Sequence, residues 1–140
     1  MAYITSRPEL PASDREMKKA VWYNMWRTRR WPYGELLRGD LLYWYESSSR
    51  LILWKTHVRR MERFRYQTKE GAARRIEQEL GPVDRTERYY RRRPEKGYCL
   101  AIKIGRVTKV RFPKPTVAGF SRLGWQRVDE SVAKQWLRAW

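Results

Sequence analysis

The sequence is poor in the residues from which most catalytic and metal sites are built. It has one cysteine, Cys99, and one histidine, His57, in 140 residues. A single cysteine excludes an internal disulfide bond and any zinc site made from several cysteines. A serine–histidine–aspartate relay would have to use His57, and no serine stands in a glycine-flanked elbow. P-loop and G-x-G-x-x-G motifs are also absent. We therefore expect a protein that is not an enzyme and needs no metal or other cofactor.

Long hydrophobic segments are missing as well. The longest uncharged stretches, 20–26 and 115–121, each have seven residues, whereas a membrane-spanning helix needs about 20 apolar residues. The first residues do not show the basic-then-apolar pattern of a signal peptide. We therefore expect a cytoplasmic protein without a membrane partner. The length and the 41% hydrophobic content predict one folded domain over residues 1–140.

Acidic residues are scarce relative to basic ones. The chain has 15 Asp and Glu against 32 Lys and Arg, which gives a formal net charge of +17. Solubility of a small domain asks for a net charge of only about 2–8. Most of the excess is arginine, whose planar guanidinium can grip phosphate with two hydrogen bonds and stack on a base. The composition therefore favours nucleic acid as the partner.

Aromatic residues, in contrast, are abundant. Eight tryptophans and nine tyrosines occur in the chain, and each buried indole N–H needs a hydrogen-bond partner. Some of these rings are therefore candidates for stacking on bases. The aromatic residues of segment 22–33 are interspersed with Arg27, Arg29 and Arg30, and Pro32 and Gly34 break this segment into a loop.

Local patterns predict the secondary structure. A short strand covers residues 2–5, and a capping box at 13–16 begins a helix whose apolar face continues to Met25. Thr68 caps a second helix that ends at Gly81-Pro82. A third helix is expected over 131–140, after a glycine-bounded loop at 119–125.

The other segments predict two hairpins and a loop. Strands at 41–45 and 50–58 form the first hairpin, whose second strand continues toward Tyr66. Strands at 98–104 and 107–112 form the second hairpin. Residues 84–96 are predicted to be an exposed, mobile loop. Together these elements predict an α+β fold with a small, mostly antiparallel, barrel-like sheet and about three flanking helices.

Several short motifs, spread over nearly the whole chain, resemble the PUA-like superfamily, in particular its EVE and YTH branches. They are the first strand with Tyr3-Ile4-Thr5-Ser6, the helix at Met17–Asn24, and the step Met25-Trp26-Arg27-Thr28. Gly39-Asp40 then opens a hairpin, and the glycine-aromatic loop Gly119–Trp125 precedes the final helix. The resemblance implies a small PUA-like barrel.

The same resemblance implies a pocket for a single base. YTH domains hold N6-methyladenine of RNA in an aromatic cage, and EVE domains are associated with modified bases in DNA. Trp26 corresponds to the cage tryptophan. Polar contacts are assigned to Thr5, Ser6 and Arg7 after the first strand and to Tyr45, Glu46 and Ser47 in the hairpin. The candidates for the second aromatic wall are Trp22, Trp31, Trp44 and Phe64.

These observations lead to one functional hypothesis and two alternatives. The hypothesis is a non-catalytic domain that captures one flipped, modified base, with DNA favoured over RNA and a nuclease or other effector as protein partner. Phosphates would be held by Arg27, Arg29, Arg30, Arg91, Arg92 and Arg93. The first alternative is a basic scaffold or assembly factor that binds RNA or DNA without reading a base. The second is an enzyme that acts on nucleic acid through His57 or a carboxylate.

Overall fold

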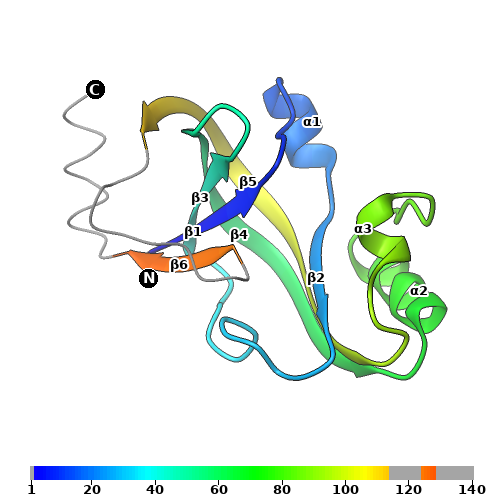
Figure 1. Cartoon of the computed structure of the whole chain (residues 1–140). Helices are drawn as coiled ribbons and strands as arrows, with labels where there is room; N and C mark the ends of the chain where they lie inside the picture. The colour runs from blue at the N-terminus through cyan, green and yellow to red at the C-terminus, as the bar shows by residue number, and fades with distance from the viewer. Residues whose placement is uncertain (1, 114–123, 129–140) are drawn as a thin grey trace. The chain divides into compact units, whose positions relative to one another are not determined.

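The computed structural model describes residues 2–113 and 124–128 (Figure 1). Its elements follow the order β1 (Ala2–Arg7), α1 (Asp14–Lys19), β2 (Trp22–Trp26), β3 (Leu41–Glu46), β4 (Leu51–Tyr66), α2 (Lys69–Glu79), α3 (Arg88–Arg91), β5 (Gly97–Pro113) and β6 (Trp125–Val128). The strands form one sheet in the order β2-β5-β4-β3-β1-β6. β1 is parallel to β3, whereas the pairs β1–β6, β2–β5 and β3–β4 are antiparallel. The predicted α+β class with a mostly antiparallel sheet is confirmed.

The chain divides into two compact units. Among the described residues, the first unit consists of 2–19, 39–58, 104–113 and 124–128, and the second consists of 20–38 and 59–103. The long strands β4 and β5 each contribute residues to both units. The return strand predicted to continue toward Tyr66 is confirmed, because β4 runs without interruption from Leu51 to that residue.

The first unit is organised around the parallel pair of β1 and β3. Its core cluster combines buried residues of five strands, with the rings of Tyr43 and Phe112 in an edge-to-face contact at 6.0 Å. The buried members of this cluster are Ala2, Ile4, Tyr43, Ile52, Phe112 and Val128. Alternating burial along β4, from Leu51 to Val58, shows that this strand places every second side chain in the interior.

The second unit is organised around α2. Thr68 caps this helix, since its hydroxyl accepts a hydrogen bond from the backbone N–H of Gly71 at 2.9 Å. The buried residues Ala72, Ala73 and Ile76 pack into the core cluster of this unit. Their partners in that cluster are Met25, Phe64, Tyr66, Leu80, Val83, Tyr90, Cys99 and Ala101. The predicted second helix is therefore confirmed together with its cap at Thr68.

The prediction of a first helix that continues to Met25 is wrong beyond Lys19. The helix begins as expected, because the hydroxyl of Ser13 accepts a hydrogen bond from the N–H of Glu16, but residues 22–26 form strand β2 instead. Aromatic residues favour strands over helices, and Val21, Tyr23 and Met25 are spaced two apart and all pack on the core of the second unit. The period of two was therefore the relevant pattern.

The predictions for the second half of the chain also need correction. The hairpin expected at 98–112 is a single strand, β5. Arg106 alone has a positive φ there, of 48°, whereas the favoured two-residue hairpin of type I′ requires two such residues. The mobile loop expected at 84–96 contains helix α3. The helix expected at 131–140 and most of the loop at 119–125 lie outside the described residues.

Candidate functional site

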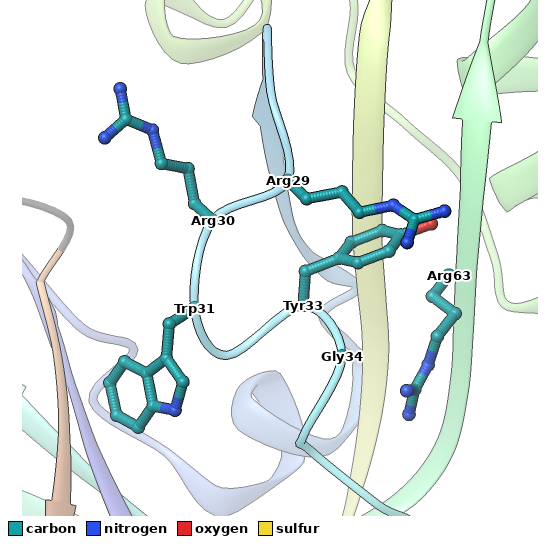
Figure 2. Close-up of a pocket in the computed structure, with 6 residues that line it drawn as sticks. All are labelled: Arg29, Arg30, Trp31, Tyr33, Gly34 and Arg63. Atoms are coloured by element: carbon teal, nitrogen blue, oxygen red, sulfur yellow. The ribbon is translucent and has the colours of Figure 1, made fainter.

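A cavity of about 490 Å³ opens in the second unit, beside the loop that follows β2 (Figure 2). Five of its lining residues come from this loop and one comes from β4: Arg29, Arg30, Trp31, Tyr33, Gly34 and Arg63. We call this cavity the arginine-aromatic pocket. The loop holds its shape through backbone hydrogen bonds from Tyr33 to Arg30 at 2.8 Å and from Leu36 to Pro32 at 3.1 Å.

Arg29 is held in the pocket by two tyrosine rings. Its guanidinium carbon lies 5.5 Å from the ring centre of Tyr98 and 5.9 Å from that of Tyr33. The two rings contact each other edge to face at 5.6 Å, and Figure 2 shows the Arg29 side chain lying along the ring of Tyr33. Both contacts are cation–π interactions, which restrain a guanidinium without using its N–H donors.

Arg63 reaches the pocket from the neighbouring strand. One of its terminal nitrogens donates a hydrogen bond to the carbonyl oxygen of Leu36, and the same nitrogen lies 3.5 Å from the sulfur of Met61. This contact ties β4 to the loop. The guanidinium of Arg63 is therefore positioned before any ligand binds.

Trp31 gives the pocket a partly exposed aromatic wall. It is 36% exposed, and its indole nitrogen donates a 2.6 Å hydrogen bond to the carboxylate of Glu35. Figure 2 shows that Trp31 and Arg30 extend to one side of the loop, whereas Arg29, Tyr33 and Arg63 lie on the other. An indole with this exposure can stack on a planar ligand.

The three arginines of the pocket lack carboxylate partners within the described part of the chain. Other arginines of the second unit do pair with glutamates: Arg60, Arg74, Arg75 and Arg85. Arg85 contacts Glu70 and Glu77, each at 2.7 Å, and its hydrogen bonds lower the pKa of Glu77 to about 2. The positive charge of the pocket, in contrast, remains available to an anionic ligand.

Three of the predicted aromatic walls are buried, which corrects those assignments. Trp26 ends β2 and is 8% exposed. Trp44 is fully buried, with its indole nitrogen donating to the hydroxyl of Thr56 at 2.9 Å. Phe64 is buried under the guanidinium of Arg75, 4.3 Å from its ring centre. None of the three lines the arginine-aromatic pocket, because strand pairing turns their rings into the interior.

The remaining candidates for the aromatic wall differ in position. Trp22 is half-buried in β2, opposite Ile102 of β5, and is not a lining residue. Trp31 is the member of the predicted set that lines the pocket. Trp31 is therefore the predicted aromatic residue that this pocket offers to a ligand.

The polar residues predicted for the pocket gather in the first unit instead. The ends of β1 and β3 place Thr5 beside Trp44, Ser6 beside Tyr45, and Arg7 beside Glu46. Arg7 donates to the hydroxyl of Thr5 at 2.9 Å and lies over the ring of Trp44 at 5.4 Å.

Backbone contacts hold these strand ends together. The N–H of Ser47 donates to the carbonyl oxygen of Arg7 at 2.9 Å, and the N–H of Ser6 donates to that of Gly124 at 2.7 Å. The carboxylate of Glu46 accepts from the N–H of Leu10 at 2.8 Å. The structure therefore divides the predicted pocket residues between the two units.

The predicted phosphate ligands also fall into groups. Arg29 and Arg30 line the pocket, whereas Arg27 is exposed just before it. Arg91 and Arg92 are exposed at the end of α3. Arg93 stacks on Tyr89 at 4.2 Å and donates to the carbonyl oxygen of that residue at 3.1 Å.

Sequence reasoning missed Tyr33, Gly34, Arg63 and Tyr98 as site residues. Tyr33 and Gly34 belong to the segment singled out for its aromatic residues and arginines, so a local pattern was present. Arg63 and Tyr98 join the loop only through the folding of β4 and β5. No local pattern identifies them.

The described residues contain no cluster suited to a metal ion. Within 2–113 and 124–128, no three His, Cys, Asp or Glu side chains gather where they could hold a metal ion. His57 is half-buried in β4, opposite Leu41. The helices of the described part are all too short or too polar to cross a membrane.

Comparison with known proteins establishes the fold. Neither a protein-family model nor a curated protein sequence matches the chain. A crystal structure of a point mutant of ZmASCH from Zymomonas mobilis is similar, with a TM-score of 0.66 and 9% sequence identity, over 98% of this chain and 96% of that one. ASCH domains have a PUA-like barrel fold, so the comparison confirms the small α+β, PUA-like barrel expected from the sequence as a fold.

Proposed function

We propose that this protein binds nucleic acid through the arginine-aromatic pocket and takes up one unstacked base there, without catalysing a reaction. The observation that carries this proposal is the pairing of unneutralised arginines with a partly exposed indole in one cavity. Arginines supply affinity for the phosphate backbone, and an aromatic ring supplies a stacking surface. The PUA-like barrel fold supports nucleic-acid binding in general, and base capture is what the resemblance of the motifs to YTH domains implies.

The free energy needed to unstack a base is comparable to what the pocket can return by stacking and phosphate contacts. Removing a base from its stack costs a few kcal/mol in a duplex and less in a single strand. Stacking on an aromatic side chain contributes about 1–3 kcal/mol. A single indole can therefore offset the cost in a single strand, and a duplex requires the phosphate contacts as well. We accordingly expect single strands to bind more tightly than duplexes.

The preference for modified DNA, a nuclease or other effector partner, and a cytoplasmic location are further predictions of this hypothesis. A binding panel tests the first of them directly. Fluorescence anisotropy would compare single and double strands of DNA and RNA, with and without modified bases, at two salt concentrations. Binding that weakens with salt is expected for every strand, with a slope of about −0.7 per phosphate contact for single strands.

Substitution of Trp31 separates base capture from general attraction to polyanions. Trp31→Ala is expected to weaken single-strand binding by about 1–3 kcal/mol and to leave the salt slope unchanged. Leu37→Ala is the matched control, because Leu37 is exposed in the same loop but does not line the pocket. Equal affinity of Trp31→Ala and wild type would reject base capture and favour the basic scaffold.

A second group of exposed arginines supports the alternative function, a basic scaffold that binds nucleic acid without reading a base. Arg91 and Arg92 are exposed at the end of α3 and form a second cationic group in this unit. If Arg91→Gln and Arg92→Gln weaken binding while Trp31→Ala does not, the scaffold function is supported. If no strand binds at low salt, both functions are rejected.

A further inference from the structure

Two arginines of the pocket are fixed in place by contacts with different elements. Arg29 is restrained by the rings of Tyr33 and Tyr98, and Arg63 by the carbonyl oxygen of Leu36. Figure 2 shows Arg29 and Arg63 on the same side of the loop as Tyr33. Because both side chains are already ordered, little side-chain entropy is lost when they bind an anion.

The charge of this pair indicates which anion fits. Within the described residues, no carboxylate pairs with either guanidinium, so the two carry about two positive charges into one cavity. An internal phosphodiester has one negative charge. A terminal phosphate has about 1.5 to 2 negative charges at pH 7 and three strong acceptor oxygens.

We propose that the arginine-aromatic pocket binds the terminal phosphate of a nucleic-acid strand, with Arg29 and Arg63 as its ligands. This inference rests on the proposed function and names the part of the strand that the pocket takes up. The guanidinium forks of the two arginines suit the several oxygens of a phosphate that is esterified only once.

A terminal nucleotide also suits the rest of the pocket. It has a stacking neighbour on one side only, so its base leaves the stack at a lower cost than an internal base. The cavity volume of about 490 Å³ falls within the usual range for small-molecule sites, about 300–1,000 Å³. Trp31 lines the same cavity from the other side of the loop, and its ring is the surface on which that terminal base would stack.

The test uses three single strands of identical sequence that carry a 5′-phosphate, a 3′-phosphate or hydroxyls at both ends. We expect one of the phosphorylated strands to bind the full chain about tenfold more tightly than the hydroxyl strand at pH 7.5. The phosphorylated strand that binds more tightly shows whether the pocket takes up the 5′ end or the 3′ end. A nucleoside monophosphate is used as competitor, and displacement of the phosphorylated strand at equal concentration would assign the site to free nucleotides instead.

The pH dependence of this preference gives a second readout on the unmodified protein. A terminal phosphate gains its second charge near pH 6, whereas arginines stay charged throughout. The preference is therefore expected to fall several-fold between pH 7.5 and pH 5. Equal binding of phosphorylated and hydroxyl strands at pH 7.5 would overturn the inference, whatever the variants do.

Substitutions test whether Arg29 and Arg63 cause the preference for a terminal phosphate. Arg29→Gln and Arg63→Gln are expected to abolish the preference for phosphate, so that they weaken binding of the phosphorylated strand about tenfold more than binding of the hydroxyl strand. Arg74→Gln, which removes an exposed arginine from α2, is the charge-matched control and should keep the preference. If both pocket variants weaken all strands by the same factor, the terminal-phosphate inference fails, while nucleic-acid binding by the pocket stands.

Discussion

The indole nitrogen of Trp44 donates a 2.9 Å hydrogen bond to the hydroxyl of Thr56, and both side chains are fully buried. The hydroxyl of Thr56 in turn donates to the carbonyl oxygen of Leu42 at 2.9 Å. These two bonds join the side chain of Thr56 in β4 to the indole of Trp44 and to the backbone carbonyl of Leu42, both in β3. The bond to Thr56 satisfies the indole N–H of Trp44, so this tryptophan, a predicted wall of the base pocket, can be buried in the first unit.

Thr56→Val is expected to destabilise the fold by about 1–3 kcal/mol, because two buried polar groups lose the hydroxyl that joins them. Chemical denaturation measures the change. Thr56→Ser keeps the hydroxyl and should recover much of the loss. A valine variant as stable as wild type would show that the hydrogen bonds contribute nothing beyond packing.

Gly97→Ala is expected to destabilise the second unit by about 1–3 kcal/mol. A Cβ at position 97 would clash with the carbonyl oxygen of Trp26 and lie 2.9 Å from its carbonyl carbon. These are backbone atoms of β2, so they cannot move away as a flexible side chain would. Gly34→Ala is the control, because nothing lies within 4 Å of a Cβ there, and it should change stability by less than about 0.5 kcal/mol.

Acid is expected to weaken the link between α2 and the segment that follows it. Hydrogen bonds from Arg85 lower the pKa of Glu77 from 4.5 to about 2. A lowered folded-state pKa means that this carboxylate stabilises the fold above pH 4.5 and loses the contribution as the pH falls toward 2. Thermal midpoints between pH 6 and pH 2 measure it. Arg85→Gln should flatten the dependence of the thermal midpoint on pH. Arg65 is exposed in β4 and serves as the control, so Arg65→Gln should leave this dependence as in wild type.

Cys99 is expected to react slowly with thiol reagents in the folded protein. Its side chain is fully buried, and burial raises the pKa of its thiol well above the usual range. Labelling with a maleimide should therefore accompany unfolding, with rapid labelling in denaturant as the control. Complete labelling of the native protein at the rate of a free thiol would contradict the burial of Cys99 in the core cluster of the second unit.

Local sequence patterns predicted those elements whose determinants lie within a few residues. Thr68 and the apolar spacing of Ala72, Ala73 and Ile76 define α2 without help from the rest of the chain. The helix predicted to reach Met25 failed because the same apolar residues satisfy a helical period and, with Tyr23, a strand period. Pairing with β5 decides between the two, and that information is not local.

The candidate site also combines residues that a local sequence pattern reveals with residues that only the fold brings together. The segment containing Arg29, Arg30, Trp31 and Tyr33 is recognisable from its composition, because arginine and aromatic rings alternate there. Arg63 and Tyr98 could not be predicted, because they lie about 30 and 65 residues further along the chain and approach the loop through β4 and β5.

The amino-acid sequence alone determined the high positive charge, the α+β class and the resemblance to the PUA-like superfamily, since these depend on composition and short motifs. Only the tertiary structure decided which aromatic rings remain accessible. Trp26, Trp44 and Trp31 are chemically the same side chain, and the first two are buried while the third is partly exposed. The difference arises because burial is set by strand pairing and packing between distant segments, which the neighbours of a residue in the sequence do not specify.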